Sequence, residues 1–572
     1  MFTTEFPRRG LTPPSWSKMG RSLAIQCPSL HFHRIAPKRN HVTLPRVPRG
    51  CCLLHKEEPR GTRADTGKTG SVRFNGSTFA NRLNSQIEAA REGTKREYHE
   101  ATPRGTTSVS QVDSVTDRST AWGACLFVSI ISLSGNVIMV RVCHVGCLIA
   151  AWVLHGFIGF AWGDDWPSWR GPAANGVSRE VELPLTWSPE EHVRWKIALP
   201  GPGNSTPIIL GDRVYLTQAT DKGKQRSLIC FNRKDGSQVW QKSVEFTATE
   251  PTHNTNPFCS ASPVTDGERI VVSHGSAGLF CYDLDGHEQW QRELGPCHHI
   301  WGNAASPVIH GELVYLNFGP GERTFLLAVD KRTGKDAWRA DEPGGKLGDK
   351  GQPEWIGSWS TPVVAKIGAR DEVILSWPGV VKSYHPQTGA VLWTCAGLSK
   401  DKATDSLVYT TPLVSPEVVI AMGGFQNAWL GLRPLGPDGA NAAGDITAAH
   451  RLWRHPSAPQ RIGSGVIVGD HVYMVNEPGT AQCIEWKTGK ILWTERATSS
   501  TWANLVLSEG RLYTTSLDGE TVVFAAQPDK LEILARNKIP ERTLASLAPA
   551  HGAIYLRTYN HLWCLATTAE QK

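Results

Sequence analysis

The stretch Thr488-Gly489-Lys490-Ile491-Leu492-Trp493 decides the fold, because its pattern recurs along the chain. In each copy a glycine is followed, after three residues, by a tryptophan that ends a β-like run. A motif that repeats about every forty to sixty residues indicates one supersecondary unit that occurs many times in the chain. The copies are Gly236/Trp240, Gly286/Trp290, Gly334/Trp338, Gly389/Trp393 and Gly489/Trp493.

The residues around each copy predict four strands per unit. A unit opens with Ser or Thr before a proline, followed by a strand, a turn and a β-branched strand such as that in Gly311–Leu316. A third strand such as Leu326–Asp330 leads to a Thr-Gly or Asp-Gly turn and to the strand that carries tryptophan. Four short strands joined by hairpin turns make one propeller blade. The opening pairs are Thr206-Pro207, Ser262-Pro263, Ser306-Pro307, Thr361-Pro362 and Thr411-Pro412.

The closing strands give the number of blades. Six units end at a tryptophan, and Ile533 holds the same place in a seventh. Residues 544–566 supply only three more strands, and a strand around Trp195 supplies the missing fourth. Joining the two ends closes the ring and removes exposed sheet edges. We therefore predict an all-β fold: an eight-bladed β-propeller of four-stranded antiparallel blades over residues 191–566. The structural closing tryptophans are Trp195, Trp240, Trp290, Trp338, Trp393, Trp453 and Trp493.

These tryptophans are expected to pack against the turn of the next blade rather than to stack on a cofactor, since each buries about 150–250 Å². The stretch from Gly424 to His450 is rich in Gly, Ala and Asp and is expected to be a surface loop within blade five. Residues 164–190 are assigned to an N-terminal segment and residues 567–572 to a tail.

The apolar stretch from Val145 to Phe160 follows Arg141 and ends before Ala161-Trp162-Gly163. This order is typical of a secretory signal peptide, so residues 139–163 are predicted to direct export to the periplasm or cell envelope, with cleavage after Gly163. A membrane anchor is the alternative, and the membrane would then be reached only through this N-terminal segment. Met139 is on this interpretation the start of the protein, with residues 1–138 an extension of the gene model.

The positive charge of the chain is confined to its beginning. The whole chain has a net charge of +7, whereas residues 1–120 hold 20 Lys and Arg against 10 Asp and Glu. This stretch has few apolar runs, so residues 1–138 are predicted to be a basic, disordered leader. The part after residue 163 has a net charge of −4, which argues against a nucleic-acid partner.

Seven cysteines follow Gly163, and none forms a Cys-x-x-Cys motif. Their spacing therefore suggests neither a zinc site nor a thioredoxin-like site. Four of them lie within β-like runs, so we expect small buried hydrophobic side chains rather than disulfides. The cysteines are Cys230, Cys259, Cys281, Cys297, Cys395, Cys483 and Cys564.

With Leu326–Asp330, Thr333-Gly334-Lys335 and Trp338, the chain resembles the pyrroloquinoline-quinone-type (PQQ-like) repeat propellers. This superfamily includes quinoprotein alcohol dehydrogenases and the outer-membrane assembly factor BamB. The opening Trp166–Pro172, with Asn175-Gly176-Val177, looks like that of exported members from planctomycete-type bacteria.

The resemblance raises the question of whether this chain binds the quinone cofactor PQQ. The dehydrogenases of the superfamily use a disulfide between adjacent cysteines, a calcium or lanthanide ion held by Glu and Asn, and a catalytic Asp. The adjacent cysteines of this chain, Cys51 and Cys52, lie in the leader, and no matching Glu/Asn/Asp set is found. PQQ with Ca²⁺ is therefore disfavoured, and no cofactor is predicted. Kinase motifs and a c-type haem motif are absent from the sequence.

Candidate binding residues lie in the loops that run from one closing strand to the next Ser/Thr-Pro pair, around one mouth of the channel. His, Asn, Trp and Arg side chains that converge on a concave surface are typical of a ligand site, although in tight loops they often only satisfy backbone groups. No metal site is predicted, because His253, His298 and His299 have no required spacing. The candidates are His253, Asn254, Asn256, His298, His299, Trp301, Trp355, Trp359, Arg461, Trp502 and Arg542.

Two classes of function follow. The favoured one is an exported scaffold or binding protein, monomeric, whose loop face receives an envelope protein, a peptide or a small ligand. The alternative is a quinoprotein-like oxidoreductase that acts on an alcohol or sugar in the axial channel. The missing cofactor residues favour the first, and no catalytic residue is assigned.

Overall fold

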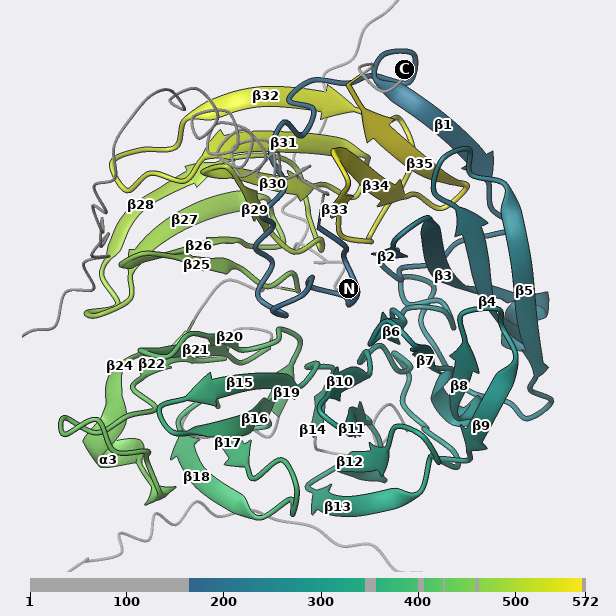
Figure 1. The fold of residues 1–572 in the computed structure, drawn as a ribbon. Coiled ribbons are helices and arrows are strands. Elements are labelled where there is room, and N and C mark those ends of the chain that lie inside the picture. The colour runs from purple at the N-terminus through teal and green to yellow at the C-terminus, as the bar shows by residue number, and fades with distance from the viewer. Residues whose placement is uncertain (1–163, 345–355, 400–405, 425–426, 458–461, 568–572) are drawn as a thin grey trace, which may run out of the picture. The chain divides into compact units, whose positions relative to one another are not determined.

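The computed structural model describes residues 164–344, 356–399, 406–424, 427–457 and 462–567. These residues form four-stranded antiparallel blades arranged in a ring (Figure 1). Among them, no helix is long and apolar enough to cross a membrane. The seven cysteines after residue 163 are all buried free thiols, as expected for the four that lie in β-like runs.

The first four blades follow the order of the chain. Blade one consists of β2 (Ile208–Leu210), β3 (Arg213–Thr220), β4 (Gln225–Asn232) and β5 (Gln238–Glu245). Blade two consists of β6 (Val264–Thr265), β7 (Arg269–Ser273), β8 (Leu279–Asp283) and β9 (Glu288–Arg292). Blade three consists of β10 (Val308–His310), β11 (Leu313–Phe318), β12 (Thr324–Asp330) and β13 (Asp336–Glu342). Blade four consists of β15 (Val363–Ile367), β16 (Arg370–Trp377), β17 (Val380–Tyr384) and β18 (Val391–Ala396).

The remaining blades complete the ring. Blade five consists of β20 (Leu413–Val414), β21 (Val419–Met422), β22 (Trp429–Leu432) and β24 (Arg451–His455). Blade six consists of β25 (Val466–Val468), β26 (His471–Val475), β27 (Thr480–Glu485) and β28 (Ile491–Arg496). Blade seven consists of β29 (Val506–Ser508), β30 (Arg511–Thr515), β31 (Glu520–Ala525) and β32 (Ile533–Lys538). Blade eight consists of β33 (Ala548–Ala550), β34 (Ala553–Arg557), β35 (His561–Ala566) and β1 (Val193–Ala198).

The prediction of eight blades closed by the strand around Trp195 is confirmed. β1 pairs with β35 in antiparallel register, which places Trp195 opposite Cys564. The short elements outside this pattern are η1 (Asp221–Gly223), η2 (Gly275–Ala277), β14 (Ile356–Ser358), β19 (Ser406–Val408), β23 (Gly444–Asp445) and α3 (Thr447–His450).

Six of the seven closing tryptophans hold the turn of the next blade. In each case the indole N–H donates a hydrogen bond to a backbone carbonyl of the turn between the third and fourth strands. The bonds run from Trp195 to Arg233 (2.8 Å), Trp240 to Leu284 (3.1 Å), Trp290 to Lys331 (2.9 Å), Trp338 to Pro386 (2.7 Å), Trp453 to Trp486 (2.7 Å) and Trp493 to Gln527 (3.3 Å).

The glycine of the repeated phrase lies against the tryptophan of the preceding blade. A Cβ atom on Gly334 would lie 2.6 Å from Cε3 of Trp290, and a Cβ on Gly389 would lie 2.5 Å from Cε3 of Trp338. Gly334 also has a φ of +68°, which L-residues other than glycine rarely adopt. Two separate demands, the turn and the close approach of the ring, therefore select glycine here.

Trp393 is the exception, and the sequence around blade five explains it. Its indole N–H donates to Glu372 Oε2 (2.7 Å), within its own blade. The turn that would receive it is replaced by residues 433–450, between β22 and β24. Within that excursion β23 pairs in parallel with β18 and covers the outer edge of blade four.

The expectation that residues 424–450 form a surface loop within blade five is wrong for the strand β22, whereas residues 433–450 are a largely exposed excursion between two strands of that blade. β22 lies inside that range as a fully buried strand, and Ala442 and Ile446 pack into the core of blade four. A strand of only four residues containing a glycine, surrounded by Gly, Ala and Asp, gave too weak a pattern to be recognised.

A second set of hydrogen bonds closes the ring near its axis. Each blade contributes one residue, which lies shortly before the innermost strand. Its backbone N–H donates a hydrogen bond to the side-chain oxygen of the equivalent residue in the next blade, with N···O distances of 2.6–3.2 Å. We call these residues the axial ring. They are, in order, Thr206, Ser262, Ser306, Thr361, Thr411, Ser464, Asn504 and Ser546, which returns to Thr206.

The N-terminal segment lies across the middle of the ring, where Figure 1 shows it in dark blue. Trp166 exchanges two backbone hydrogen bonds with Ile209 of blade one, and the Thr265 N–H of blade two donates to the Pro167 carbonyl. Ser178 N–H donates to the Leu507 carbonyl of blade seven. The segment thus joins blades that are far apart around the ring.

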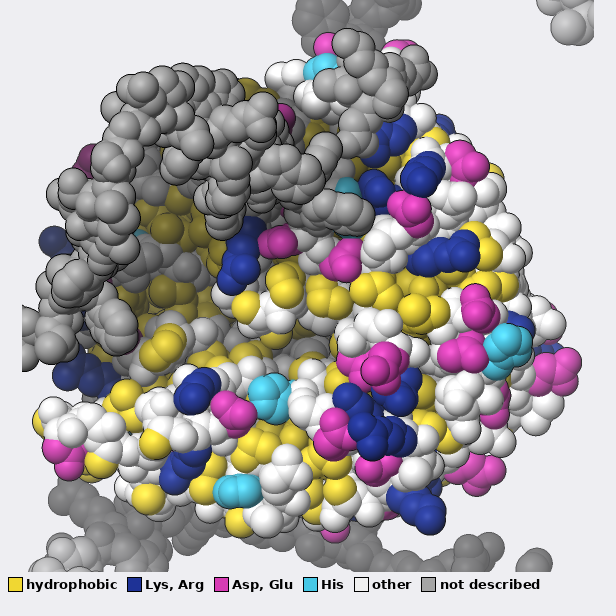
Figure 2. Space-filling view, in the orientation of Figure 1, with side chains coloured by type: hydrophobic (Ala, Val, Ile, Leu, Met, Phe, Trp, Pro, Cys, Tyr) yellow, Lys and Arg dark blue, Asp and Glu magenta, His cyan; other side chains and the backbone are white. Residues whose placement is uncertain are grey.

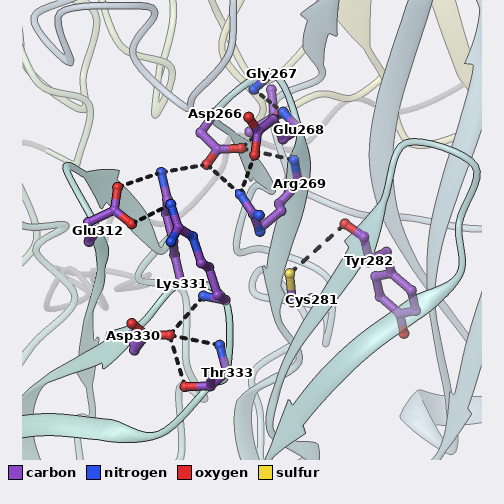
Figure 3. A network of polar contacts seen from close by, with 12 residues as sticks. Asp266, Gly267, Glu268, Arg269, Cys281, Tyr282, Glu312, Asp330, Lys331 and Thr333 are labelled. Carbon is purple, nitrogen blue, oxygen red and sulfur yellow. Dashed lines mark hydrogen bonds and ion pairs between the residues drawn. The ribbon is translucent and has the colours of Figure 1, made fainter.

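Ion pairs add to the contact between blades two and three (Figure 3). Lys331 Nζ lies 3.1 Å from Asp266 Oδ2 and 3.4 Å from Glu312 Oε1, and Arg269 lies 3.3 Å from Asp266 Oδ2. The Lys331 carbonyl also accepts the indole N–H of Trp290. Pairs this close to the surface each contribute about 0–1 kcal/mol, so the buried tryptophan stabilises the contact between these blades more than the ion pairs do.

We expect Gly334→Ala to destabilise the protein by about 1–3 kcal/mol more than Gly311→Ala, because only the first places a methyl group against a buried ring. Both glycines have positive φ, +68° and +58°, but a Cβ on Gly311 would meet nothing within 4 Å. The free energy of unfolding in urea measures the difference. Equal losses would show that the contact with Trp290 is unimportant.

Candidate functional site

A cavity opens among the inter-blade loops at the axis of the ring, and we call it the axial cup. Its volume is about 130 Å³. Loops from several blades line it because each inner strand starts at the same end of the channel. The lining residues are Trp169, Asn204, Thr255, Asn256, Ser260, Ala304, Trp359, Thr361, Tyr409, Ile462, Trp502, Asn504, Leu544 and Ser546.

The aromatic part of the cup comes from four different places in the chain. Trp169 belongs to the N-terminal segment, whereas Trp359, Tyr409 and Trp502 belong to the blades or the loops between them. Trp359 donates its indole N–H to the Gly302 carbonyl (2.9 Å), and its ring centroid lies 5.6 Å from that of Tyr409. Trp502 donates to Glu477 Oε1 (3.1 Å). These bonds hold Trp359 and Trp502 in place.

The polar part of the cup is built from amides and hydroxyls. Asn204 donates to the Thr255 carbonyl (2.9 Å), and its Oδ1 is buried without a hydrogen-bond partner. Asn256 Nδ2 donates to the carbonyls of Trp301 and Asn303 and so ties two loops together. Three members of the axial ring, Thr361, Asn504 and Ser546, also face the cup.

The described lining of the cup carries no Asp, Glu, Lys, Arg or His. Nor do any three His, Cys, Asp or Glu side chains converge on a point suited to a metal, within the part of the chain that the structure describes. On the face seen in Figure 2, Lys and Arg are interspersed with Asp and Glu. The lining that the structure describes is therefore uncharged and partly aromatic.

The structure brings some of the predicted site residues together at the axis. Asn256, Trp359 and Trp502 line the cup. His299 and Trp301 lie buried beside Trp359, with ring centroids 5.0 and 6.1 Å from it. These five residues thus form one cluster at the cup and behind its wall.

Three other predicted residues, Asn254, His298 and Arg542, are exposed on the loops. Arg542 lies over the ring of Tyr559, 5.6 Å from its centroid. His253 is half-buried, and its Nδ1 lies 2.7 Å from Thr255 Oγ1; burial lowers its pKa. Trp355 and Arg461 lie outside the described residues.

Several lining residues were missed in the sequence. Asn204 precedes the Ser-Thr-Pro of blade one, and Asn504 and Ser546 belong to the axial ring although no proline follows them. Aligning blades by the position before the innermost strand, rather than by Ser/Thr-Pro, would have found the last two. Nothing local marks Trp169, because its place depends on the path of the N-terminal segment.

A buried ion pair supports the loop of blade two behind the cup. Arg226 NH2 lies 2.5 Å from Glu250 Oε2, and the two side chains are 2% and 3% exposed. The same guanidinium donates to the His274 carbonyl and lies over the rings of Phe246 and Phe258. Removing either partner would leave a buried charge unpaired.

Two histidines of this region are held neutral. Both ring nitrogens of His274 are buried without a partner, and burial, together with the charge of Arg226, lowers its pKa to about 3. Burial lowers the pKa of His299 to about 4; its Nδ1 accepts from the Trp301 N–H (3.3 Å), and its buried Nε2 has no partner.

We expect stability to fall on acidification because of His274. Its folded pKa lies below the ordinary value of about 6.5, so its contribution is complete above pH 6.5 and decreases as the pH falls towards 3. Each pH unit of acidification in that window lowers the free energy of unfolding by up to about 1.4 kcal/mol. His274→Leu should remove about 2 kcal/mol of the loss between pH 6.5 and 5, measured by urea unfolding. Exposed His298→Ala is the control, and the same pH dependence in His274→Leu and wild type would contradict the assignment.

The chain is similar in sequence to a known enzyme over part of its length. Polyvinylalcohol dehydrogenase of Sphingopyxis sp. (strain 113P3) is 24% identical over 277 residues, which span 42% of this chain and 41% of that enzyme. The chain thus matches less than half the length of this curated relative.

Two solved structures are similar to much of this chain. A europium-containing methanol dehydrogenase is 11% identical with a TM-score of 0.50, over 69% of this chain and 90% of the other. BamB from Moraxella catarrhalis is 16% identical with a TM-score of 0.46, over 64% and 98%. The family model described as outer membrane protein assembly factor BamB matches residues 187–257, 225–495 and 326–568. The chain therefore belongs to this family of PQQ-like repeat β-propellers.

Proposed function

We propose that the protein is a binding protein whose axial cup takes a small, uncharged, hydroxylated molecule such as a sugar or polyol. The observation that carries this proposal is the lining: Trp169, Trp359, Tyr409 and Trp502 lie beside Asn, Ser and Thr side chains, and no charged side chain is among the described lining residues. Apolar rings with a few convergent polar groups are typical of small-molecule sites.

The chemistry of the lining restricts the ligand. A charged ligand would lose its hydration in the cup without gaining an ionic partner, which is unfavourable. A sugar or polyol presents hydroxyls that exchange hydrogen bonds with amides, and the buried Asn204 Oδ1 is an acceptor still without a donor. Its C–H groups can pack on the flat indole faces.

The position of the cup favours a small ligand over a protein partner. It lies at the axis among loops, and a protein would have to insert a side chain or a terminus to reach Trp169. A relative named as an outer membrane assembly factor suggests a protein partner instead, and the exposed loop residues Asn254, His298 and Arg542 would then be in contact with it.

An alcohol dehydrogenase is the second candidate, because the chain is similar to an enzyme named for polyvinyl alcohol, a polymer of neutral hydroxyl groups. The residues present do not fit the quinone and its metal. The described lining offers neither the Glu nor the Asp that the metal and catalysis require, and no pair of adjacent cysteines. No oxidation step is therefore assigned to this chain.

We expect saturable binding of one or more members of a panel of glucose, galactose, maltose and sorbitol, measured by calorimetry and by tryptophan fluorescence. Trp502→Ala should weaken it at least about tenfold, or about 1.4 kcal/mol, through loss of ring contact. Leu534→Ala, on the exposed outer strand β32, is the control and should bind like wild type.

Two outcomes would contradict the proposal. Binding of glucuronate without binding of any neutral member would show that the cup recognises charge. Dye-linked oxidation of alcohols after incubation with PQQ and Ca²⁺ would favour the dehydrogenase.

Export is part of the same proposal, because residues 139–163 have the order of charged, apolar and small residues of a signal peptide. We expect sequencing of the mature N-terminus to begin at Asp164. A peptide from residues 1–120 in the purified protein would contradict this processing, and an intact apolar segment in a membrane fraction would indicate an anchor.

A further inference from the structure

Arg170 of the N-terminal segment is a buried cation whose described contacts are all neutral. It is 3% exposed. Its Nε donates to the Ala174 carbonyl (3.3 Å), and one terminal nitrogen donates to the carbonyls of Asn175 (2.7 Å) and Gly465 (2.7 Å). The other terminal nitrogen, NH1, is buried without a hydrogen-bond partner.

Burial lowers the pKa of Arg170 to about 9, and no acidic group contributes to the shift. The guanidinium nonetheless keeps its charge at neutral pH. A buried charge without an ionic partner is unfavourable, and partial charges on carbonyl oxygens offset it only in part. An anion bound beside the guanidinium would balance this charge, and it is the simplest way to complete the site.

A separate cavity of about 10 Å³ lies beside Arg170, between the N-terminal segment and the inner strands of blades three to five. That volume accommodates one particle of about the size of a water molecule. Ser168, Thr361 and Thr411 contribute hydroxyls to its lining, and the remaining lining includes prolines, valines and Trp169.

The axial ring prepares two of these hydroxyls to donate. Thr361 Oγ1 accepts the Ser306 N–H (3.2 Å), and Thr411 Oγ1 accepts the Thr361 N–H (3.1 Å). Because both oxygens act as acceptors in the ring, their hydroxyl hydrogens are left for another acceptor. Together with NH1 of Arg170, the residues that line the cavity thus offer three unused donors, and no carboxylate is among the described lining residues.

We infer that this cavity is a binding site for a single small monovalent anion of the halide class, held by Arg170 NH1 and the hydroxyls of Thr361 and Thr411. A water molecule could satisfy NH1, but it would not offset the charge. The anion would stabilise the N-terminal segment beneath Trp169. This inference does not depend on the ligand of the axial cup.

The direct test is diffraction from crystals of the wild-type protein grown with sodium bromide in place of chloride. We expect an anomalous peak within hydrogen-bonding distance of Arg170 NH1. Water density without a bromide peak would overturn the inference.

The solution test compares the thermal midpoint in sodium chloride and in sodium gluconate at equal ionic strength, since gluconate is too large for the cavity. We expect chloride to raise the midpoint of wild type by a few degrees, and expect Arg170→Met to lose that difference. If Arg170→Met does not fold, Thr411→Val should reduce the chloride effect while Thr411→Ser retains it. A midpoint that is independent of chloride up to physiological concentration, even with a bromide peak, would mean an adventitious ion only and would also overturn the inference.

Discussion

The axial ring of eight hydrogen bonds is the constraint on which the rest of the structure depends. Each blade gives one backbone N–H and receives one in return through a side-chain oxygen, so no blade can shift along the axis without breaking two bonds. The ring also closes between Ser546 of blade eight and Thr206 of blade one, residues that lie 340 positions apart in the sequence. Short polar side chains are needed at these positions because longer ones would fill the channel.

This constraint also determines the chemistry of the site. Thr361, Asn504 and Ser546 hold the blades together and at the same time line the axial cup. Their neutral amide and hydroxyl groups give the cup its polarity, and the inter-blade loops add the aromatic rings. The uncharged character of the cup thus follows partly from how the propeller closes, and the loops then select among neutral ligands.

The fold could be predicted from the sequence because its main determinants are local. The glycine of a turn and the tryptophan four residues later recur in five of the eight units, although the contact they make joins the tryptophan to the turn of the next blade. The prediction failed where that pattern is interrupted: β22 is short and contains Gly431, and the excursion after it packs on blade four. The site was harder to predict than the fold, because the sequence of a loop does not indicate which of its side chains point towards the axis of the propeller. Asn256 lines the cup whereas Asn254 of the same loop is exposed, and His299 is buried beside Trp359 whereas its neighbour His298 is exposed.

Buried arginines add hydrogen bonds at two junctions of the propeller. At the junction of blades eight and one, Arg557 donates to Ser205 Oγ (2.7 Å), the Thr217 carbonyl (2.7 Å) and Gln218 Oε1 (2.8 Å). Gly203 allows this approach, since a Cβ there would lie 1.8 Å from the guanidinium. Arg170 ties the N-terminal segment to Gly465 in the same way. A guanidinium offers five donors in a fixed plane, so one side chain can replace several backbone bonds at a junction. The ring is closed inside blade eight by the backbone pairing of β1 with β35, and the two guanidinium groups add hydrogen bonds between blades eight and one and between the N-terminal segment and blade six.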